Sequence, residues 1–370
     1  MKGGNAMKTY SNFYKSVKTH QNSFFIGANT KNGFRYADST FLNENNLTKL
    51  YIIKGGPGTG KSSLMKRLRD DLEASGISAC SYYCSSDPDS LDAVVFENGN
   101  VRVAIADGTA PHILDAALPG AVSETVDLGK FWNSDALEKS LNDIARHAAL
   151  KALAFDKTRM YMASSTELFS LMTCSAREGY LSEKAENAAI RIAKELPHQR
   201  KAQIIRNVCT AAVSMKGAVR LTAFENAEKL IGIEDFASLS PLFLETLSNV
   251  LIKKGHSIAV SRSPLGEIYE LYLPEADVAF IPVREGVQYC KILRMRRFAE
   301  SEYFSRRAAK RHFNEKCLTE LLDGALSALE EAKEHHFAIE EIYSKAMDFS
   351  MFDTLYASLL QNSKKRLGVL

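Results

Sequence analysis

The first third of the chain alternates between apolar runs and segments with helical spacing. Residues 50–53 (LYII) form a short apolar run, and leucines recur every four positions at Leu64, Leu68 and Leu72, before Gly76. A short apolar run is typical of a buried strand, whereas a repeat of three to four residues indicates a helix with one buried face. Glycine after the last periodic residue is a common helix stop. The pattern predicts a strand, a loop and a helix in this order.

Two more apolar runs predict strands further along the first half. Residues 79–84 lead into a loop of sequence CSSDPDSLD, and residues 101–107 (VRVAIAD) end in Asp107. In open parallel sheets the loops at the carboxyl ends of the strands form the ligand-binding edge. We therefore expect an α/β fold with a mainly parallel sheet, helices on both faces in three layers, and these loops gathered at one edge.

The two halves of the chain show similar patterns. Residues 50–68 align with residues 230–248, so that Leu64 meets Leu244. The other matched pairs are Gly76 with Gly255, Val101 with Val278 and Gly27 with Gly217. Helical spacing follows in each half, at residues 133–200 and as one or two long amphipathic helices at residues 317–347. This repeat predicts a duplicated fold with helical additions, in two domains of residues 1–205 and 206–370.

The loop after residues 50–53 carries a phosphate-binding motif. Gly55, Gly60, Lys61 and Ser62 fit the pattern GxxxxGK[ST] between a predicted strand and a predicted helix. Glycines let successive main-chain N–H groups point into one concavity, and the helix N-terminus adds partial positive charge. A glycine-rich turn that binds nothing is the alternative, and both flanks argue against it. The residues expected to hold a nucleotide are Gly56, Pro57, Gly58, Thr59, Gly60, Lys61, Ser62 and Ser63.

The motif predicts the three-layer fold of P-loop NTPases for the first half, and a degenerate copy for the second. At the positions of Gly60, Lys61 and Ser62 the second half has Ser240, Pro241 and Leu242. Proline lacks an N–H donor, and leucine offers no oxygen to a metal ion. We therefore expect one phosphate site in the chain.

Acidic residues near the predicted sheet edge are candidates for metal binding and catalysis. Ser62 and Asp107 are expected to hold Mg²⁺, because an aspartate at the end of an apolar strand faces the loop serine in such folds. Asp87, Asp89 and Asp92 are candidates for a base or an acceptor-binding group. The alternative for this loop is a Ser-Asp-Pro turn in which Asp89 caps a short helix.

The sequence favours ATP over GTP and leaves the reaction open. No NKxD element for reading guanine is present, and no glutamate follows Asp107, which points to slow hydrolysis, a base elsewhere or transfer to an acceptor. His112, at the same edge, is expected to be structural. His336 and Glu340 share a helix face, but a metal site is not expected there without a third ligand.

Composition and charge narrow the partners and the compartment. The net charge is +3, and no apolar run approaches the about 20 residues needed to cross a bilayer. The six cysteines form no CxxC pair, and the N-terminal 17 residues lack the apolar stretch of a secretion signal, so we expect a cytoplasmic protein. The basic segment 291–316 contains aromatic residues, but a solvated helix face with aromatics turned inward is favoured over a nucleic-acid surface.

Four segments together resemble a family of bacterial P-loop ATPases built of two tandem halves. They are YIIKGGPGTGKSSLMKRL, CSSDPDSLD, VAIADGTAPH and the near-terminal IYSKAMDF. The resemblance follows the order of elements over nearly the whole chain and implies ATP binding. Both halves commonly carry a phosphate loop in that family, and this chain departs from the pattern at residues 240–242.

Three functions are consistent with these features. The first is Mg²⁺-dependent ATP hydrolysis coupled to a conformational change between the halves, with Lys61, Asp107 and Asp87 as catalytic residues. The second is a small-molecule or nucleotide kinase with its acceptor beside Asp87. The third is a non-catalytic nucleotide sensor that presents the basic segment to a partner.

Overall fold

The chain folds into two compact units that interleave along the sequence. The computed structural model describes residues 13–19, 22–38, 40–110, 113–197 and 203–370. Among these, unit 1 comprises residues 13–19, 27–37 and 158–326, and unit 2 comprises residues 22–26, 38–157 and 327–370. The first twelve residues and His112 lie outside the described part.

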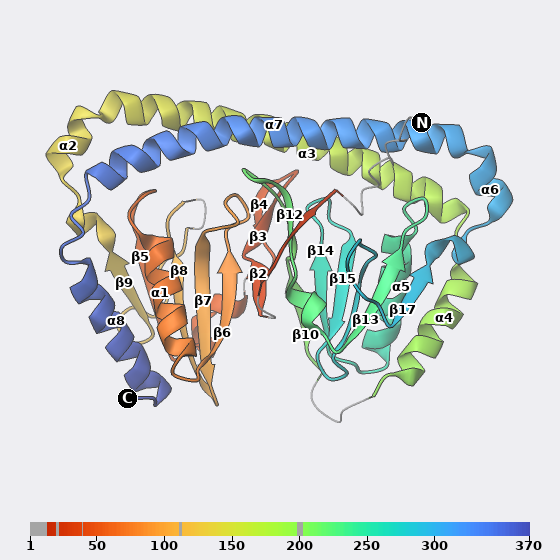
Figure 1. Cartoon of the computed structure of the whole chain (residues 1–370), viewed down its shortest axis with the longest axis horizontal. Helices are drawn as coiled ribbons and strands as arrows, with labels where there is room; N and C mark the ends of the chain where they lie inside the picture. Colours follow the sequence, from red (N-terminus) through yellow and green to blue (C-terminus); the bar gives the residue numbers. More distant parts are fainter. Residues whose placement is uncertain (1–12, 20–21, 39, 111–112, 198–202) are drawn as a thin grey trace. The chain divides into compact units, whose positions relative to one another are not determined.

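Unit 2 contains a six-stranded sheet of order β2-β6-β7-β8-β5-β9 (Figure 1). Its strands are β2 (Ser23–Phe25), β5 (Lys49–Lys54), β6 (Ser78–Tyr83), β7 (Leu91–Asn98), β8 (Val101–Asp107) and β9 (Ser123–Asp127). The pairs β2–β6, β5–β8 and β5–β9 are parallel, whereas β6–β7 and β7–β8 are antiparallel. The sheet is therefore mixed, and the expectation of a mainly parallel sheet needs correction. The reason is β7, which the sequence pattern did not identify and which a tight turn at Gly99 joins to β8.

Two helices from opposite ends of the chain pack on one face of this sheet. Leu64 and Leu68 of α1 (Lys61–Glu73) and Tyr356 of α8 (Phe352–Leu367) share a buried core with Tyr51 and Ile53 of β5. Alternate residues of a strand point to one face, so both helices cover the same side of β5. The described residues show an α/β unit with a mixed sheet, and the expected three-layer arrangement is not confirmed.

Unit 1 repeats this topology strand for strand. Its six-stranded sheet has the order β10-β14-β15-β16-β13-β17. The strands are β10 (Ile205–Val208), β13 (Lys229–Glu234), β14 (Ile258–Arg262), β15 (Ile268–Leu273), β16 (Val278–Pro282) and β17 (Lys291–Arg294). The β14–β15 and β15–β16 pairs are antiparallel and the other three are parallel, as in unit 2. The same connectivity in both sheets supports the duplication inferred from the sequence.

Strand register identifies equivalent positions in the two repeats. Ile53 of β5 pairs with Asp107, and the equivalent Ile233 of β13 pairs with Pro282. The place of Asp107 is therefore taken by a proline in unit 1. Two matched pairs are wrong. Lys49 pairs with Val103 and the equivalent Lys229 pairs with Val278, so Val278 corresponds to Val103 rather than to Val101. Gly217 opens the second strand of its hairpin and corresponds to Gly33, which has a similar positive φ, rather than to Gly27.

The smaller elements surround these sheets. The hairpin strands are β3 (Gly27–Thr30) with β4 (Gly33–Tyr36), and β11 (Ala211–Ser214) with β12 (Gly217–Leu221), which also pairs with β1 (Lys15–Val17). The short helices are α2 (Ser134–Lys139), α6 (Ser301–Arg306), η2 (Thr40–Leu42), η3 (Glu44–Asn46), η4 (Leu128–Phe131), η5 (Ala223–Asn226) and η6 (Met295–Phe298).

The helices that follow each sheet are exchanged between the units. Helix α4 (Ser182–Glu195) follows the first sheet along the chain but packs on α5 (Ser240–Lys253) in unit 1. Helix α8 follows the second sheet but packs on α1 in unit 2. The long helices α3 (Leu141–Glu178) and α7 (Ala308–Lys345) each pass from one unit into the other. Each unit is therefore built from both halves of the chain.

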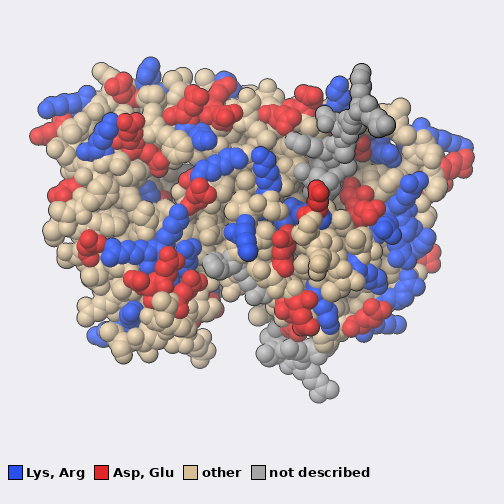
Figure 2. Space-filling view, viewed as in Figure 1, with Lys and Arg blue, Asp and Glu red and all other residues tan. Residues whose placement is uncertain are grey.

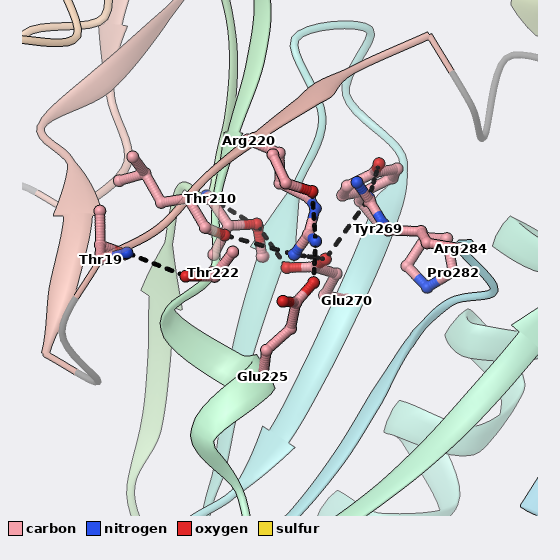
Figure 3. Close-up of polar contacts among 12 residues, drawn as sticks. Thr19, Thr210, Arg220, Thr222, Glu225, Tyr269, Glu270, Pro282 and Arg284 are labelled. Carbon is pink, nitrogen blue, oxygen red and sulfur yellow. Dashed lines mark hydrogen bonds and ion pairs between the residues drawn. The ribbon is translucent and has the colours of Figure 1, made fainter. Parts of the chain in front are cut away.

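In unit 1 a buried ion network joins the three-stranded sheet β1-β12-β11 to the six-stranded sheet. Figure 3 shows Glu270 of β15 between the side chains of Arg220 and Thr210. Arg220 Nη1 lies 3.2 Å from Glu270 Oε1, and the Thr210 hydroxyl donates to Glu270 Oε2 at 2.7 Å. Arg220 also pairs with Glu225, and both Arg220 and Glu270 are fully buried. Each buried charge thus depends on its partners for the hydrogen bonds that water would otherwise supply.

Four of the nine lysine and arginine side chains in the basic segment 291–316 pair with neighbouring carboxylates in unit 1. Its ion pairs are Arg294 with Glu234, Arg306 with Glu302, Arg307 with Glu178 and Arg311 with Glu315. Phe298 and Phe304 are buried, whereas Phe313 is exposed. Figure 2 shows basic and acidic side chains interspersed on the face in view. Among the described residues, no helix combines the length and the apolar character needed to cross a bilayer.

Candidate functional site

The glycine loop joins β5 to α1 in unit 2 and requires glycine at two positions. Gly58 and Gly60 have φ angles of 72° and 84°, in the left-handed region that side chains disfavour. Gly60 precedes the first turn of α1, and its carbonyl accepts the N–H of Leu64. The first N–H groups of a helix have no partner within it and attract anions. The loop and the start of α1 therefore present main-chain donors where the sequence motif predicts them.

Lys61 and Asp107, which the sequence predicts to act together, are close in the structure. Lys61 Nζ donates to the carbonyl oxygens of Gly55 and Gly56, at 2.7 Å each, and lies 3.6 Å from Asp107 Oδ2. Each of the two side chains is 13% exposed. The ammonium group thus lies against the loop with a carboxylate beside it.

Asp107 is held at the end of β8 by the residue that follows Gly108. The N–H of Thr109 donates to Asp107 Oδ1 at 2.8 Å, and the Thr109 hydroxyl donates to the Gly55 carbonyl at 2.8 Å. Burial raises the pKa of Asp107, while Lys61 and Thr109 oppose this shift. Thr109, to which the sequence analysis gave no role, therefore ties the aspartate to the loop. Its adjacency to a strand-end aspartate was the available signal.

The other predicted acidic residues lie around the loop in different environments. Asp87 Oδ2 accepts the Ser90 hydroxyl at 2.6 Å within a turn, and Asp89 in the same turn is exposed. No helix begins there, so the alternative that Asp89 caps a short helix is wrong. Asp92 is buried at the start of β7, and its charge contributes to the raised pKa of Asp107. The Ser62 hydroxyl accepts the N–H of Leu91 at 3.0 Å.

The end of α7 lies directly against the loop. A Cβ atom added to Gly58 would lie 2.4 Å from the carbonyl oxygen of Glu340, a distance that real Cβ atoms do not tolerate. A Cβ atom at Gly56 would lie 3.1 Å from the ring of Tyr343, and one at Gly60 would lie 3.1 Å from the ring of Phe352. The glycines therefore allow close packing as well as the backbone turn. This contact was not predicted from the sequence, although Tyr343 lies in the segment IYSKAMDF that carries the family resemblance.

The contact continues beyond the helix. Trp132, the single tryptophan of the chain, packs edge to face on Tyr343 with ring centroids 5.5 Å apart. The N–H of Asn133 donates to the Ala346 carbonyl at 2.8 Å, and the N–H of Asp348 donates to the Phe131 carbonyl at 2.8 Å. These contacts fix the end of α7 within unit 2 next to the loop.

Three titratable side chains of α3 and α7 lie over the same region. His336 Nε2 is 3.6 Å from Glu340 Oε1, which confirms that the two residues share a face. Burial and the neighbouring charge of Lys151 lower the pKa of His336 to about 4. Burial and the charge of Asp87 raise the pKa of Glu340. The main-chain N–H of Gly58 and the positive charges of Lys61 and Lys151 lower this pKa and so oppose the shift. Burial lowers the pKa of Lys151.

Two oxygen donors near the sheet edge are of the type that holds magnesium at phosphate sites. Among the described residues, no group of three or more His, Cys, Asp or Glu side chains could hold a metal ion alone. Magnesium at phosphate sites usually takes one or two protein oxygens and completes its shell with phosphate and water. The Ser62 hydroxyl and the Asp107 carboxylate are donors of this kind, at the loop and at the adjacent strand end.

The equivalent loop of unit 1 is occupied by its own carboxylate. Asp235 Oδ1 accepts the N–H of Ser240 at 2.8 Å and its hydroxyl at 2.6 Å. Asp235 Oδ2 accepts the N–H of Ser238 at 3.2 Å. Asp235 corresponds to Gly55 of the first repeat. A side chain of the loop itself therefore takes the donors at the start of α5.

Comparison with known proteins bears on one segment. Residues 37–95 match the family described as Nephrocystin 3, N-terminal. This domain occurs in P-loop NTPase-related proteins, and the match contains β5, the glycine loop, α1 and β6. It ends before Asp107 and does not reach α7. No curated protein and no solved structure matches the chain.

Proposed function

We propose that unit 2 binds ATP with Mg²⁺ at the loop of residues 55–62 and turns it over. The observation that carries this proposal is the joint placement of the left-handed glycines, the start of α1, and the Lys61 and Asp107 side chains 3.6 Å apart. A turn that binds nothing has no need of a half-buried lysine beside a strand-end aspartate. The match of residues 37–95 to a domain of P-loop NTPase-related proteins supports the same interpretation.

Each residue has a definite part in this proposal. The N–H groups of residues 56 and 58–63 hold the phosphates, and Lys61 moves from the loop carbonyls to the outer phosphates, where it neutralises developing charge. Ser62 and Asp107 hold the magnesium ion, which neutralises charge on the phosphates. We further propose that the chain belongs to a tandem P-loop ATPase family, with unit 1 as the copy whose loop donors are taken by Asp235.

A kinase remains the second candidate because of Asp87. This carboxylate lies close enough to Glu340 and His336 to shift the pKa of both, and these side chains lie over the loop. An acceptor hydroxyl bound beside Asp87 would have a base available. ADP formation that depends on an added acceptor would select the kinase, and tight binding without turnover would select a nucleotide sensor.

Substitution of Lys61 tests the proposal. We expect Lys61→Ala to weaken ATP binding at least about tenfold, because a charge-assisted contact to phosphate is lost. Lys66→Ala, on the same helix beyond the loop, is the matched control and is expected to leave affinity unchanged. Titration followed by the fluorescence of Trp132, with phosphate release measured in parallel, gives binding and turnover. Equal affinities for the wild type and Lys61→Ala would refute the site.

A further inference from the structure

Residues from the C-terminal part of the chain pack against the glycine loop. The carbonyl of Glu340 touches Gly58, Tyr343 touches Gly56 and Phe352 touches Gly60, all within unit 2. Within this contact the Glu340 carboxylate faces the N–H of Gly58 closely enough for that group to lower its pKa. A carboxylate therefore lies at a donor that the motif assigns to phosphate.

The charges around Glu340 are those that a phosphate would meet. Lys61 and Lys151 act on it electrostatically as cations, His336 lies 3.6 Å away, and Asp87 is the nearby anion. A polyphosphate at the loop would bring several negative charges into this group. Like charges at such short range repel strongly where water is partly excluded. Glu340 and a bound phosphate are therefore unfavourable neighbours in the present arrangement.

The second repeat shows the same pairing of a loop with an internal carboxylate. Asp235 accepts N–H groups of Ser238 and Ser240 at the start of α5. There the carboxylate belongs to the loop and is always present. In the first repeat the corresponding position is Gly55, and the carboxylate comes instead from α7, whose end is held by side-chain packing and a few main-chain hydrogen bonds.

We propose that Glu340 competes with the nucleotide's phosphates for the N–H of Gly58, against which it packs, so that binding displaces its carboxylate and the end of α7. The inference rests on the proposed function, because it concerns the same anion site. This displacement regulates the site, because breaking the contact between α7 and the loop costs free energy and the cost lowers the affinity for nucleotide. Bound nucleotide also changes the packing of Tyr343 on Trp132, which makes the tryptophan a reporter.

Glu340→Gln tests the competition because it removes the charge and keeps the size of the side chain. We expect this variant to bind ATP about tenfold or more tightly than the wild type, since a charged competitor for the same donors is lost. Glu341→Gln is the matched control, because Glu341 is exposed and pairs with Lys345, and its affinity is expected to equal that of the wild type. Affinity for adenosine, which has no phosphate, is expected to be the same in all three proteins.

Tripolyphosphate as a second probe separates failure of the inference from failure of the proposed function. Tighter binding of tripolyphosphate by Glu340→Gln, with no binding of ATP by any protein, would retain the competition and reject the nucleotide site. Equal ATP affinity in the wild type and Glu340→Gln would reject the competition and retain the nucleotide site. Weaker binding, or loss of hydrolysis at unchanged affinity, would make Glu340 a binding or catalytic residue and overturn the inference. No binding of either probe by either protein would reject both.

Discussion

Two Arg–Glu ion pairs in unit 1 have the same N–O distance, but one is buried and the other is exposed. Comparing them tests how much the buried ion network contributes to the stability of this unit. Arg220 Nη1 lies 3.2 Å from Glu270 Oε1, and Arg294 Nε lies 3.2 Å from Glu234 Oε2. The first two side chains are 0% exposed, whereas the second two are 70% and 48% exposed. Glu270→Gln and Glu234→Gln each remove one negative charge, so both variants have the same net charge.

The expected losses of stability differ because water can replace only the exposed partner. Breaking a buried ion pair from one side costs about 3–5 kcal/mol, since the remaining charge stays buried. An exposed pair contributes about 0–1 kcal/mol. Glu225 still pairs with Arg220 in the variant, which places the expected cost of Glu270→Gln near the lower end, at about 3 kcal/mol.

Urea unfolding of the wild type and both variants, followed by far-UV circular dichroism, measures the difference. We expect Glu270→Gln to lower the free energy of unfolding by about 3 kcal/mol and Glu234→Gln by less than about 1 kcal/mol. Losses for the two variants that agree within about 1 kcal/mol would refute the assignment of the network as a main stabilising feature of unit 1.

Two further predictions concern unit 2. Folding lowers the pKa of His336 from 6.5 to about 4, so the unfolded chain binds a proton on this ring more tightly than the folded chain does. The contribution of His336 to the free energy of unfolding is therefore present above pH 6.5 and is lost as the pH falls toward 4. NMR titration of the His336 ring is expected to show this low pKa, and Lys151→Met is expected to raise it; a pKa near 6.5 in both proteins would contradict the burial described. Asp107→Asn is expected to make ATP affinity less dependent on Mg²⁺ without unfolding unit 2. Titrations of ATP with and without Mg²⁺ measure this dependence. An unchanged dependence would contradict the prediction.

The local elements around the loop were predictable because each has a strong short-range pattern. The strand at residues 50–53, the helix with Leu64, Leu68 and Leu72, and the stop before Gly76 all lie where periodicity and glycine place them. The pairing of Lys61 with Asp107 was also predictable, because adjacent parallel strands bring their carboxyl ends together.

The sheet topology was not predictable from the same signals. Residues 91–98 form an antiparallel strand, but an apolar sequence does not indicate whether a strand runs parallel or antiparallel to its neighbours. Direction follows from the tight connection at Gly99, which a hairpin needs and a parallel crossover excludes. A glycine two residues from an apolar run was the signal that the sequence analysis passed over.

Contacts between segments far apart in the chain were the least predictable. Glu340, Tyr343 and Phe352 reach the glycine loop because α7 and α8 return to unit 2, about 280 residues after the loop. Nothing in the local pattern of α7 distinguishes the face that meets the loop from a solvated face. The repeat gave the number of units, whereas the exchange of terminal helices between them required the structure.

The number of nucleotides bound by each chain is the most direct test of the central claim. Isothermal titration calorimetry of the wild type with MgATP is expected to give one site per chain, and Lys61→Ala is expected to remove it. Replacement of Asp235 by alanine, which acts in the other repeat, is expected to leave that single site intact. Two sites per chain in the wild type, or one site that persists in Lys61→Ala, would contradict the account.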